Sequence, residues 1–268
     1  VRLGESMKKL LYFFLLATCF QTLFAVRLTY KYTRSEPLLY ELTMDSASTF
    51  ISPDSGKREL KMKTVIRMKQ ELLEADADGY MKIAMTVLSA TQEVNGVEKP
   101  FPAAQNQTQI LRMKENGKIL STLTQIPGQA MDQDAMQMIF PESEVDVGFM
   151  WKQEKNIAQP LPVETQTLYK ITEIKDKMIR ISSIMKLKNQ KGDSVQAQTK
   201  GNTLFDAEKG KIVESFADSK FQFEIPLRVP GLLPNNSNVK VTMHMKMHIH
   251  EIVEKKDKSQ NNTKKESK

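Results

Sequence analysis

The sequence predicts an all-β protein of antiparallel meanders with one short helix, and two patterns indicate this fold. Between residues 26 and 253, apolar side chains recur at every second position in several segments. That period is typical of a strand that packs one face on a core and turns the other to water. Turn dipeptides such as Asn95-Gly96, Asn116-Gly117 and Lys209-Gly210 join these segments as hairpins. We expect a curved sheet, a sandwich or a partly open barrel.

The alternation is clearest in residues 81–87, 179–187, 221–229 and 239–250. In the last of these segments every odd position is apolar and every even position is polar or charged. We therefore expect one face of this strand to be buried and the other to be exposed. The expected buried face carries Met243, Met245 and Met247, and the expected exposed face carries His244, His248 and His250.

One short helix is predicted for residues 129–139. Met131, Ala135 and Met138 fall on one face of a helix in this segment. Pro127-Gly128 precedes the segment and Pro141 follows it, which sets its two ends.

The chain also contains a weak internal repeat. Residues 79–85 followed by 110–119 resemble residues 176–182 followed by 203–212, because each pair combines a strand, a Gly-Lys turn and a return strand. The pattern predicts two duplicated halves, about 26–150 and 151–253, within one β-rich domain of residues 26–253. The two curved halves would meet across one core.

The first 25 residues have the order of a secretory signal peptide. Met7-Lys8-Lys9 is a cationic start, an apolar run follows to Phe20, and Ala25 offers a small residue for cleavage. The run is about half the length of roughly 20 apolar residues that a membrane span needs. We expect residues 1–25 to be an N-terminal extension and cleavable signal peptide, and the mature chain to be periplasmic or extracellular with no transmembrane segment.

The single cysteine, Cys19, lies within this predicted signal. Leu16-Ala17-Thr18-Cys19 resembles a lipoprotein cleavage box, so a lipid anchor on Cys19 is an alternative. Thr18 fits poorly before such a cysteine, and the apolar residues after it are a poor solvated tether. We therefore favour cleavage after Ala25, which leaves a mature chain without cysteine and without disulfides.

The positive charge of the chain lies mostly at its ends. The formal net charge is +7, of which residues 1–25 carry +2 and residues 254–268 carry +3, so that +2 remains for the folded part. A nucleic-acid partner is therefore not expected. Residues 254–268 contain no apolar side chain, and we expect them to form a disordered charged tail.

Two segments carry a family resemblance. Residues 140–151 contain a Pro…Val-x-Val-Gly-x-x-Trp pattern, and residues 201–212 contain a Gly…Phe-Asp-x-x-x-Gly-x-Ile pattern. In this order after a signal peptide, they resemble a family of exported bacterial β-rich proteins known only as a domain of unknown function. The resemblance implies an all-β, non-enzymatic protein and assigns no active site. The residues themselves indicate structural roles: Gly148 and Gly210 as turn glycines and Trp151 as a core anchor.

No catalytic constellation is found in the sequence. The predicted mature chain has no cysteine and no Gly-x-Ser-x-Gly, and its three histidines are crowded on one strand. The carboxylate pairs Asp76/Asp78, Asp132/Asp134 and Glu142/Glu144 lie at expected turns, where capping and solvation explain them. We therefore expect a protein that is not an enzyme and needs no cofactor.

Three functions stay open at this point. The first is a structural or interaction module of the cell envelope with an unknown protein partner. The second is a carrier that holds an apolar or lipid ligand on a concave β face, where methionines would give an adaptable surface. The third is copper or zinc binding by His244, His248 and His250 with the neighbouring methionines. For these residues a plain strand, with histidines in water and methionines in the core, is the simpler interpretation.

Overall fold

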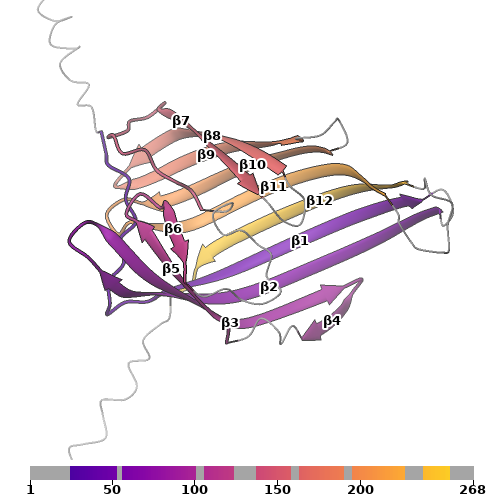
Figure 1. The fold of residues 1–268 in the computed structure, drawn as a ribbon, viewed down its shortest axis with the longest axis horizontal. Coiled ribbons are helices and arrows are strands. Elements are labelled where there is room, and N and C mark those ends of the chain that lie inside the picture. The colour runs from indigo at the N-terminus through magenta and orange to yellow at the C-terminus, as the bar shows by residue number, and fades with distance from the viewer. Residues whose placement is uncertain are drawn as a thin grey trace, which may run out of the picture.

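The computed structural model describes residues 25–52, 56–100, 106–123, 137–157, 163–189, 195–226 and 238–253. In these ranges the chain is all-β, and its twelve strands form one antiparallel sheet that does not close into a barrel (Figure 1). The prediction of a curved sheet of antiparallel meanders is confirmed. The predicted helix at 129–139 lies outside the described residues except for 137–139, which are not helical, and the described ranges contain no helix.

The strands are long, and most are joined to the next one along the chain. They are β1 (Leu38–Ser52), β2 (Gly56–Ala75), β3 (Tyr80–Val94), β4 (Val97–Pro100), β5 (Thr108–Lys114), β6 (Ile119–Thr122), β7 (Met150–Ile157), β8 (Val163–Lys175), β9 (Met178–Asn189), β10 (Val195–Asp206), β11 (Lys211–Pro226) and β12 (Asn238–Glu251).

The sheet is a meander whose first and last strands pair at its centre. The strand order is β6-β5-β3-β2-β1-β12-β11-β10-β9-β8-β7, and β4 pairs with β3 beside this path. The β1–β12 pair joins the strands of residues 38–122 to those of residues 150–251. The duplication of the two halves stays a prediction.

A row of small residues lies where β9, β10 and β11 run side by side. Gly201 on β10 pairs with Ser183 on β9 and Ala217 on β11. A Cβ atom at Gly201 would come within 2.5 Å of Ser183 Oγ and 3.1 Å of the Phe216 carbonyl oxygen. An added Cβ would therefore displace the Ser183 hydroxyl and press on the Phe216 carbonyl, and glycine in a strand interior is typical of a bend in a sheet.

The main core lies at one end of the sheet, where the two halves curl toward each other. Phe140 is 2% exposed and packs between Tyr30 and Phe205, at ring-centroid distances of 4.9 and 4.8 Å. The same cluster joins side chains of β3 and β5 to side chains of β8, β9 and β10, although these strands lie far apart in the strand order. The sheet must therefore be curled around this face. The buried cluster consists of Leu28, Tyr30, Met81, Ile83, Met113, Met138, Phe140, Val145, Tyr169, Ile171, Ile179, Ile181, Phe205 and Ala207.

Residues 25–37, which we name the strap, cross this end of the sheet (Figure 1). The amide of Tyr30 donates to the Glu115 carbonyl at 2.7 Å, and the amide of Lys31 donates to the Gly210 carbonyl at 2.9 Å. Glu115 and Gly210 belong to the two Gly-Lys turns of the internal repeat. Consecutive residues of the strap thus tie the two halves of the sheet together.

Three buried tyrosines and the half-buried Tyr32 make the fold sensitive to high pH. Burial raises the pKa of Tyr169 to about 12, and burial also raises the pKa values of Tyr30, Tyr32 and Tyr40. An unfolded tyrosine ionises near pH ~10. Because the raised folded-state pKa favours the neutral phenol, this stabilisation is complete below about pH 10 and is lost as the pH rises through about 12 and beyond.

We therefore expect alkaline unfolding between about pH 10 and 12, with tyrosine ionisation and loss of β-sheet signal occurring together. The measurement is a parallel titration by ultraviolet absorbance and circular dichroism, with a sample in denaturant as the control. Ionisation of all tyrosines near pH ~10 in a chain that keeps its sheet would contradict the burial of these side chains.

Candidate functional site

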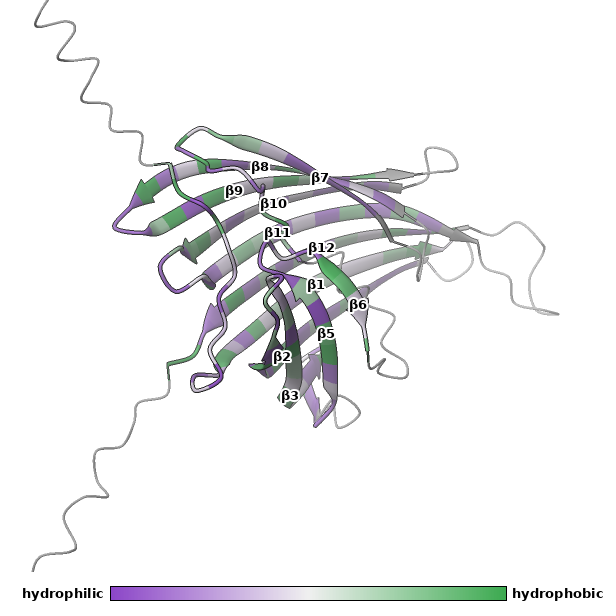
Figure 2. Cartoon of the chain, turned by 60° about the vertical axis from the view of Figure 1, so that its left-hand side comes forward, coloured by the Kyte–Doolittle hydropathy of each residue, from purple (hydrophilic) through white to green (hydrophobic). Residues whose placement is uncertain are grey.

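The two faces of the central strands differ sharply in chemistry. Paired residues on neighbouring strands point to the same side of a sheet, so the register assigns each position to a face. We name the side that carries the core the inner face and the opposite side the outer face. On β1, β10, β11 and β12 the described inner positions are apolar, glycine, serine or threonine, except Glu251, which forms an ion pair with Lys211. The alternation is visible as bands along the strands in Figure 2.

The outer face of the same strands is charged. Asp45 on β1 faces Lys246 on β12, which in turn faces Asp218 on β11. Lys220 and His244 form the next pair. Charges are well hydrated on this side, whereas a charge on the inner face would lie among apolar side chains.

A cluster of methionines lies at the middle of the inner face. Met44 on β1 pairs with Met247 on β12, and Ser46 pairs with both Met245 on β12 and Met62 on β2. These side chains and Met243 are all half-buried, in contrast to the closed core at the other end of the face. We name this cluster the methionine patch: Met44, Met62, Met243, Met245 and Met247.

Small hydroxyl side chains lie between the larger ones, and they hydrogen-bond to each other. Thr199 Oγ1 donates to Ser219 Oγ at 2.8 Å, and Thr203 Oγ1 and Ser215 Oγ are 2.9 Å apart. Ser219 is 3% exposed and lies beside Met245 in the register. Because these hydroxyls satisfy one another, the inner positions of β1, β10, β11 and β12 other than Glu251 offer an uncharged surface of methyl, thioether and phenyl groups.

The histidines lie on the outer face, opposite the methionines, as the alternation predicts. The expectation of one buried and one exposed face on this strand is wrong, because Met243, Met245, Met247 and all three histidines are half-buried. The physical reason is the architecture. The sheet is a single layer, and the buried cluster contains no residue of β12, although Val241 of that strand is 2% exposed.

Two of the histidines pair with a carboxylate on β11. His244 Nε2 lies 2.8 Å from Asp218 Oδ1, and this hydrogen bond lowers the pKa of Asp218. His248 Nε2 lies 3.0 Å from Glu214 Oε1, and its ring stacks on Phe216 and His250 at centroid distances of 4.0 and 5.0 Å. In the described part of the chain, no group of three or more His, Cys, Asp or Glu side chains is placed to hold a metal ion.

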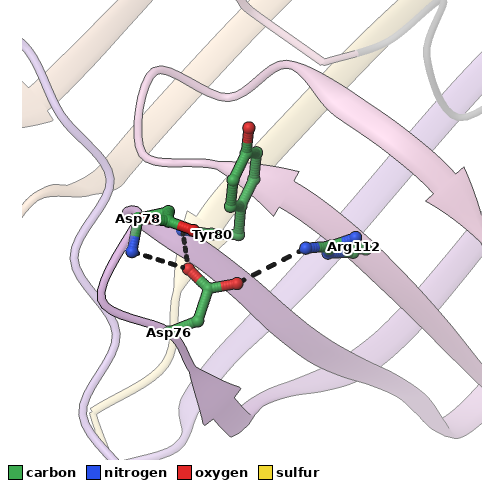
Figure 3. Close-up of polar contacts among 4 residues, drawn as sticks. All are labelled: Asp76, Asp78, Tyr80 and Arg112. Carbon is green, nitrogen blue, oxygen red and sulfur yellow. Dashed lines mark hydrogen bonds and ion pairs between the residues drawn. The ribbon is translucent and has the colours of Figure 1, made fainter.

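The carboxylate pairs noted in the sequence lie in turns or loops wherever the structure describes them. Asp76 Oδ1 accepts hydrogen bonds from the amides of Asp78 and Tyr80 at 3.1 and 2.9 Å, and Asp76 Oδ2 lies 3.4 Å from Arg112 Nη2 (Figure 3). The Arg112 guanidinium also lies 4.8 Å from the centroid of the Tyr80 ring. This arrangement closes the β2–β3 turn. Glu142 and Glu144 are exposed in a loop, and Asp132 and Asp134 lie outside the described residues.

The three residues expected to be structural occupy structural positions. Trp151 packs against the core, donates its indole N–H to the Ile139 carbonyl at 2.9 Å and stacks on Tyr169 at 5.0 Å. Gly148 and Gly210 have φ values of 93° and 62°, which are turn conformations.

Sequence reasoning missed Gln109. Gln109 pairs with Met85, two residues along β5 from the buried Ile83–Leu111 pair and on the same inner face. Its side chain is 9% exposed, and among the described residues its amide oxygen Oε1 has no hydrogen-bond partner. A signal was present, because a polar residue interrupts the apolar alternation of Leu111 and Met113.

Comparisons with solved structures support the sheet architecture. The sheet is similar to part of lipovitellin, in a structure described as lipid–protein interactions in lipovitellin, with a TM-score of 0.52 and 10% identity. The match covers 83% of this chain, which spans only 26% of the lipovitellin chain. DynF from the dynemicin biosynthesis pathway of Micromonospora chersina and a porin of Rh. blastica match with 12% and 7% identity. The DynF match covers 84% of this chain and 90% of DynF, with a TM-score of 0.20. The porin match covers 81% of this chain and 100% of the porin, with a TM-score of 0.23. Both TM-scores are too low to indicate a shared fold.

No curated protein matches the sequence. No described helix is long and apolar enough to cross a membrane. The resemblance to a domain of unknown function is confirmed, because residues 90–216 match the family model "Family of unknown function (DUF6263)".

Proposed function

We propose that the protein is exported and binds an apolar or lipid ligand against the inner face of its sheet. The observation that carries this proposal is the difference between the two faces of β1, β10, β11 and β12. The inner face presents half-buried methionines and phenylalanines, together with serine and threonine hydroxyls that hydrogen-bond to one another. The outer face is charged. Large exposed apolar surfaces on a protein are typical of binding sites.

The size and chemistry of the surface support a lipid. The inner row of β1 from Leu42 to Phe50 covers eight residue steps, or about 27 Å at ~3.4 Å per residue. Half of a bilayer's hydrocarbon core is ~15 Å thick, so an extended acyl chain fits along this row. Methionine side chains are flexible and polarizable, so they adapt to chains of different shape.

The fold comparison agrees with this proposal. The matched part of lipovitellin belongs to a protein whose structure is described in terms of lipid–protein interactions. At 10% identity this match concerns the fold alone. The argument for a lipid ligand therefore depends on the side chains of the inner face of this chain. The competing function is a module that binds a protein partner in the cell envelope, and it predicts a chain purified without lipid.

The test is detergent-free purification of the full chain, followed by native mass spectrometry before and after organic extraction. We expect a bound species that extraction removes and that has the mass of a lipid. Met245→Glu places a carboxylate in the methionine patch and should lower lipid occupancy at least about tenfold, since a buried charge without a partner is strongly unfavourable.

The matched control is Thr242→Glu, which introduces the same charge on the outer face of the same strand. It should leave lipid occupancy unchanged. Circular dichroism of both variants checks that the sheet is retained. A wild-type chain that carries no lipid, or equal occupancy in the two folded variants, would overturn the proposed function.

A further inference from the structure

A buried polar group on the inner face finds no hydrogen-bond partner for its oxygen among the described residues. Gln109 is nine-tenths buried on β5, and in the described structure its amide oxygen has no hydrogen-bond partner. The other amide buried to the same extent, Gln153, accepts from the Ile139 amide at 3.1 Å and donates to the Gln137 carbonyl at 3.0 Å. An unpaired buried acceptor is rare in native proteins, and a hydrogen-bond donor of a bound ligand would satisfy it.

Gln109 lies at the edge of the packed core on β5, and the buried Tyr40 and Leu42 of β1 lie between its row and the half-buried Met44. Gln109, Met85, Gln70 and Leu38 form one row across β5, β3, β2 and β1. On one side of the row lie the buried Ile83 and Leu111. On the other side, six residues along β1 from Leu38, lies Met44 of the methionine patch.

The distance from Gln109 to the methionine patch can be compared with the length of a lipid chain. Three strand spacings of ~4.8 Å and six residues of ~3.4 Å separate Gln109 from Met44, which is on the order of 25 Å along the sheet. A lipid chain that spans half of a ~30 Å hydrocarbon core covers more than half of this distance. A polar group at Gln109 therefore allows the chain of the same molecule to extend toward the methionines.

We infer that the ligand is an uncharged lipid with a free hydroxyl group, and that this hydroxyl hydrogen-bonds to the side-chain amide of Gln109. The inference rests on the proposed function. A hydroxyl both donates and accepts, so it pairs with the amide in either orientation of the side chain. A charged headgroup is disfavoured at this place, because the residues in the row of Gln109, which are Met85, Gln70 and Leu38, carry no charge.

The experiment compares three probes that differ only in the headgroup: dioleoylglycerol, its acetylated derivative without the hydroxyl, and dioleoylphosphatidic acid. The full chain is stripped of lipid and incubated with phosphatidylcholine vesicles that contain one probe each, and occupancy is measured by native mass spectrometry. We expect dioleoylglycerol to exceed the acetylated probe by about tenfold, because the acetylated probe leaves the amide unpaired. Phosphatidic acid should bind no better than the acetylated probe.

Gln109→Leu should remove this preference and still bind both uncharged probes, whereas Gln198→Leu, the same change at an exposed position of β10, should keep it. Binding of the wild-type chain to both uncharged probes within twofold would overturn the inference and leave the proposed function standing. The inference would also be overturned if Gln109→Leu kept the preference for dioleoylglycerol, or if the wild-type chain bound phosphatidic acid better than the uncharged probes. A folded wild-type chain that binds none of the probes would overturn the proposed function and this inference together.

Discussion

Replacing Phe140 by alanine is expected to lower the free energy of unfolding by about 3–5 kcal/mol. Phe140 is 2% exposed, and its ring packs on Tyr30 of the strap and Phe205 of β10. Its backbone amide also donates to the Asn116 carbonyl at 2.8 Å, in the turn between β5 and β6. The ring therefore fills the space where three parts of the chain meet.

The measurement is urea unfolding followed by the fluorescence of Trp151, the only tryptophan, which packs against this core. Phe216→Ala is the matched control, because Phe216 lies on the outer face and is 47% exposed. We expect it to change the free energy of unfolding by no more than about 1 kcal/mol. Equal effects of the two substitutions would mean that the halves of the sheet are not joined through Phe140.

The strands were predictable from the sequence because each one has a local period. The odd positions of residues 81–87 and 221–223, and those of 239–249, lie on the inner face as the alternation predicts. The pairing of β1 with β12 was not predictable, because it joins residues about 200 positions apart and no local pattern encodes it. The strap was also missed, since its role depends on contacts with two distant turns.

In the candidate site too, the local pattern was predictable and the long-range pairing was not. The sequence of β12 alone shows which of its side chains lie on the apolar face and which on the polar face. Whether these faces continue onto β1, β2 and β11 depends on the pairing register of the strands. The half-buried state of β12 could not be predicted either, because the alternation indicates which side faces the core and not how far the core extends. The sequence shows Gln109 only as a polar residue in line with the apolar Leu111 and Met113, and the lack of a partner for its amide oxygen among the described residues is visible only in the structure.

Gly210→Ala is the second substitution with a large expected effect, and it tests the strap. Gly210 has a φ of 62°, a conformation that disfavours a side chain by about 1–2 kcal/mol. An added Cβ would also lie 2.5 Å from the Lys31 amide nitrogen and 2.7 Å from Lys31 Cβ. These are atoms of the strap close to its backbone, so a change of rotamer cannot remove the clash.

We expect Gly210→Ala to lower the free energy of unfolding by about 2–5 kcal/mol, since overpacking adds about 1–3 kcal/mol to the conformational strain. Gly148→Ala is the control, because Gly148 has a φ of 93° but no atom within 4 Å of the added Cβ. It should show only the strain of about 1–2 kcal/mol. Because the clash falls on Lys31, limited proteolysis should cut the strap faster in Gly210→Ala than in Gly148→Ala. If the two variants have the same stability and the same cleavage rate, the strap does not tie the two Gly-Lys turns together.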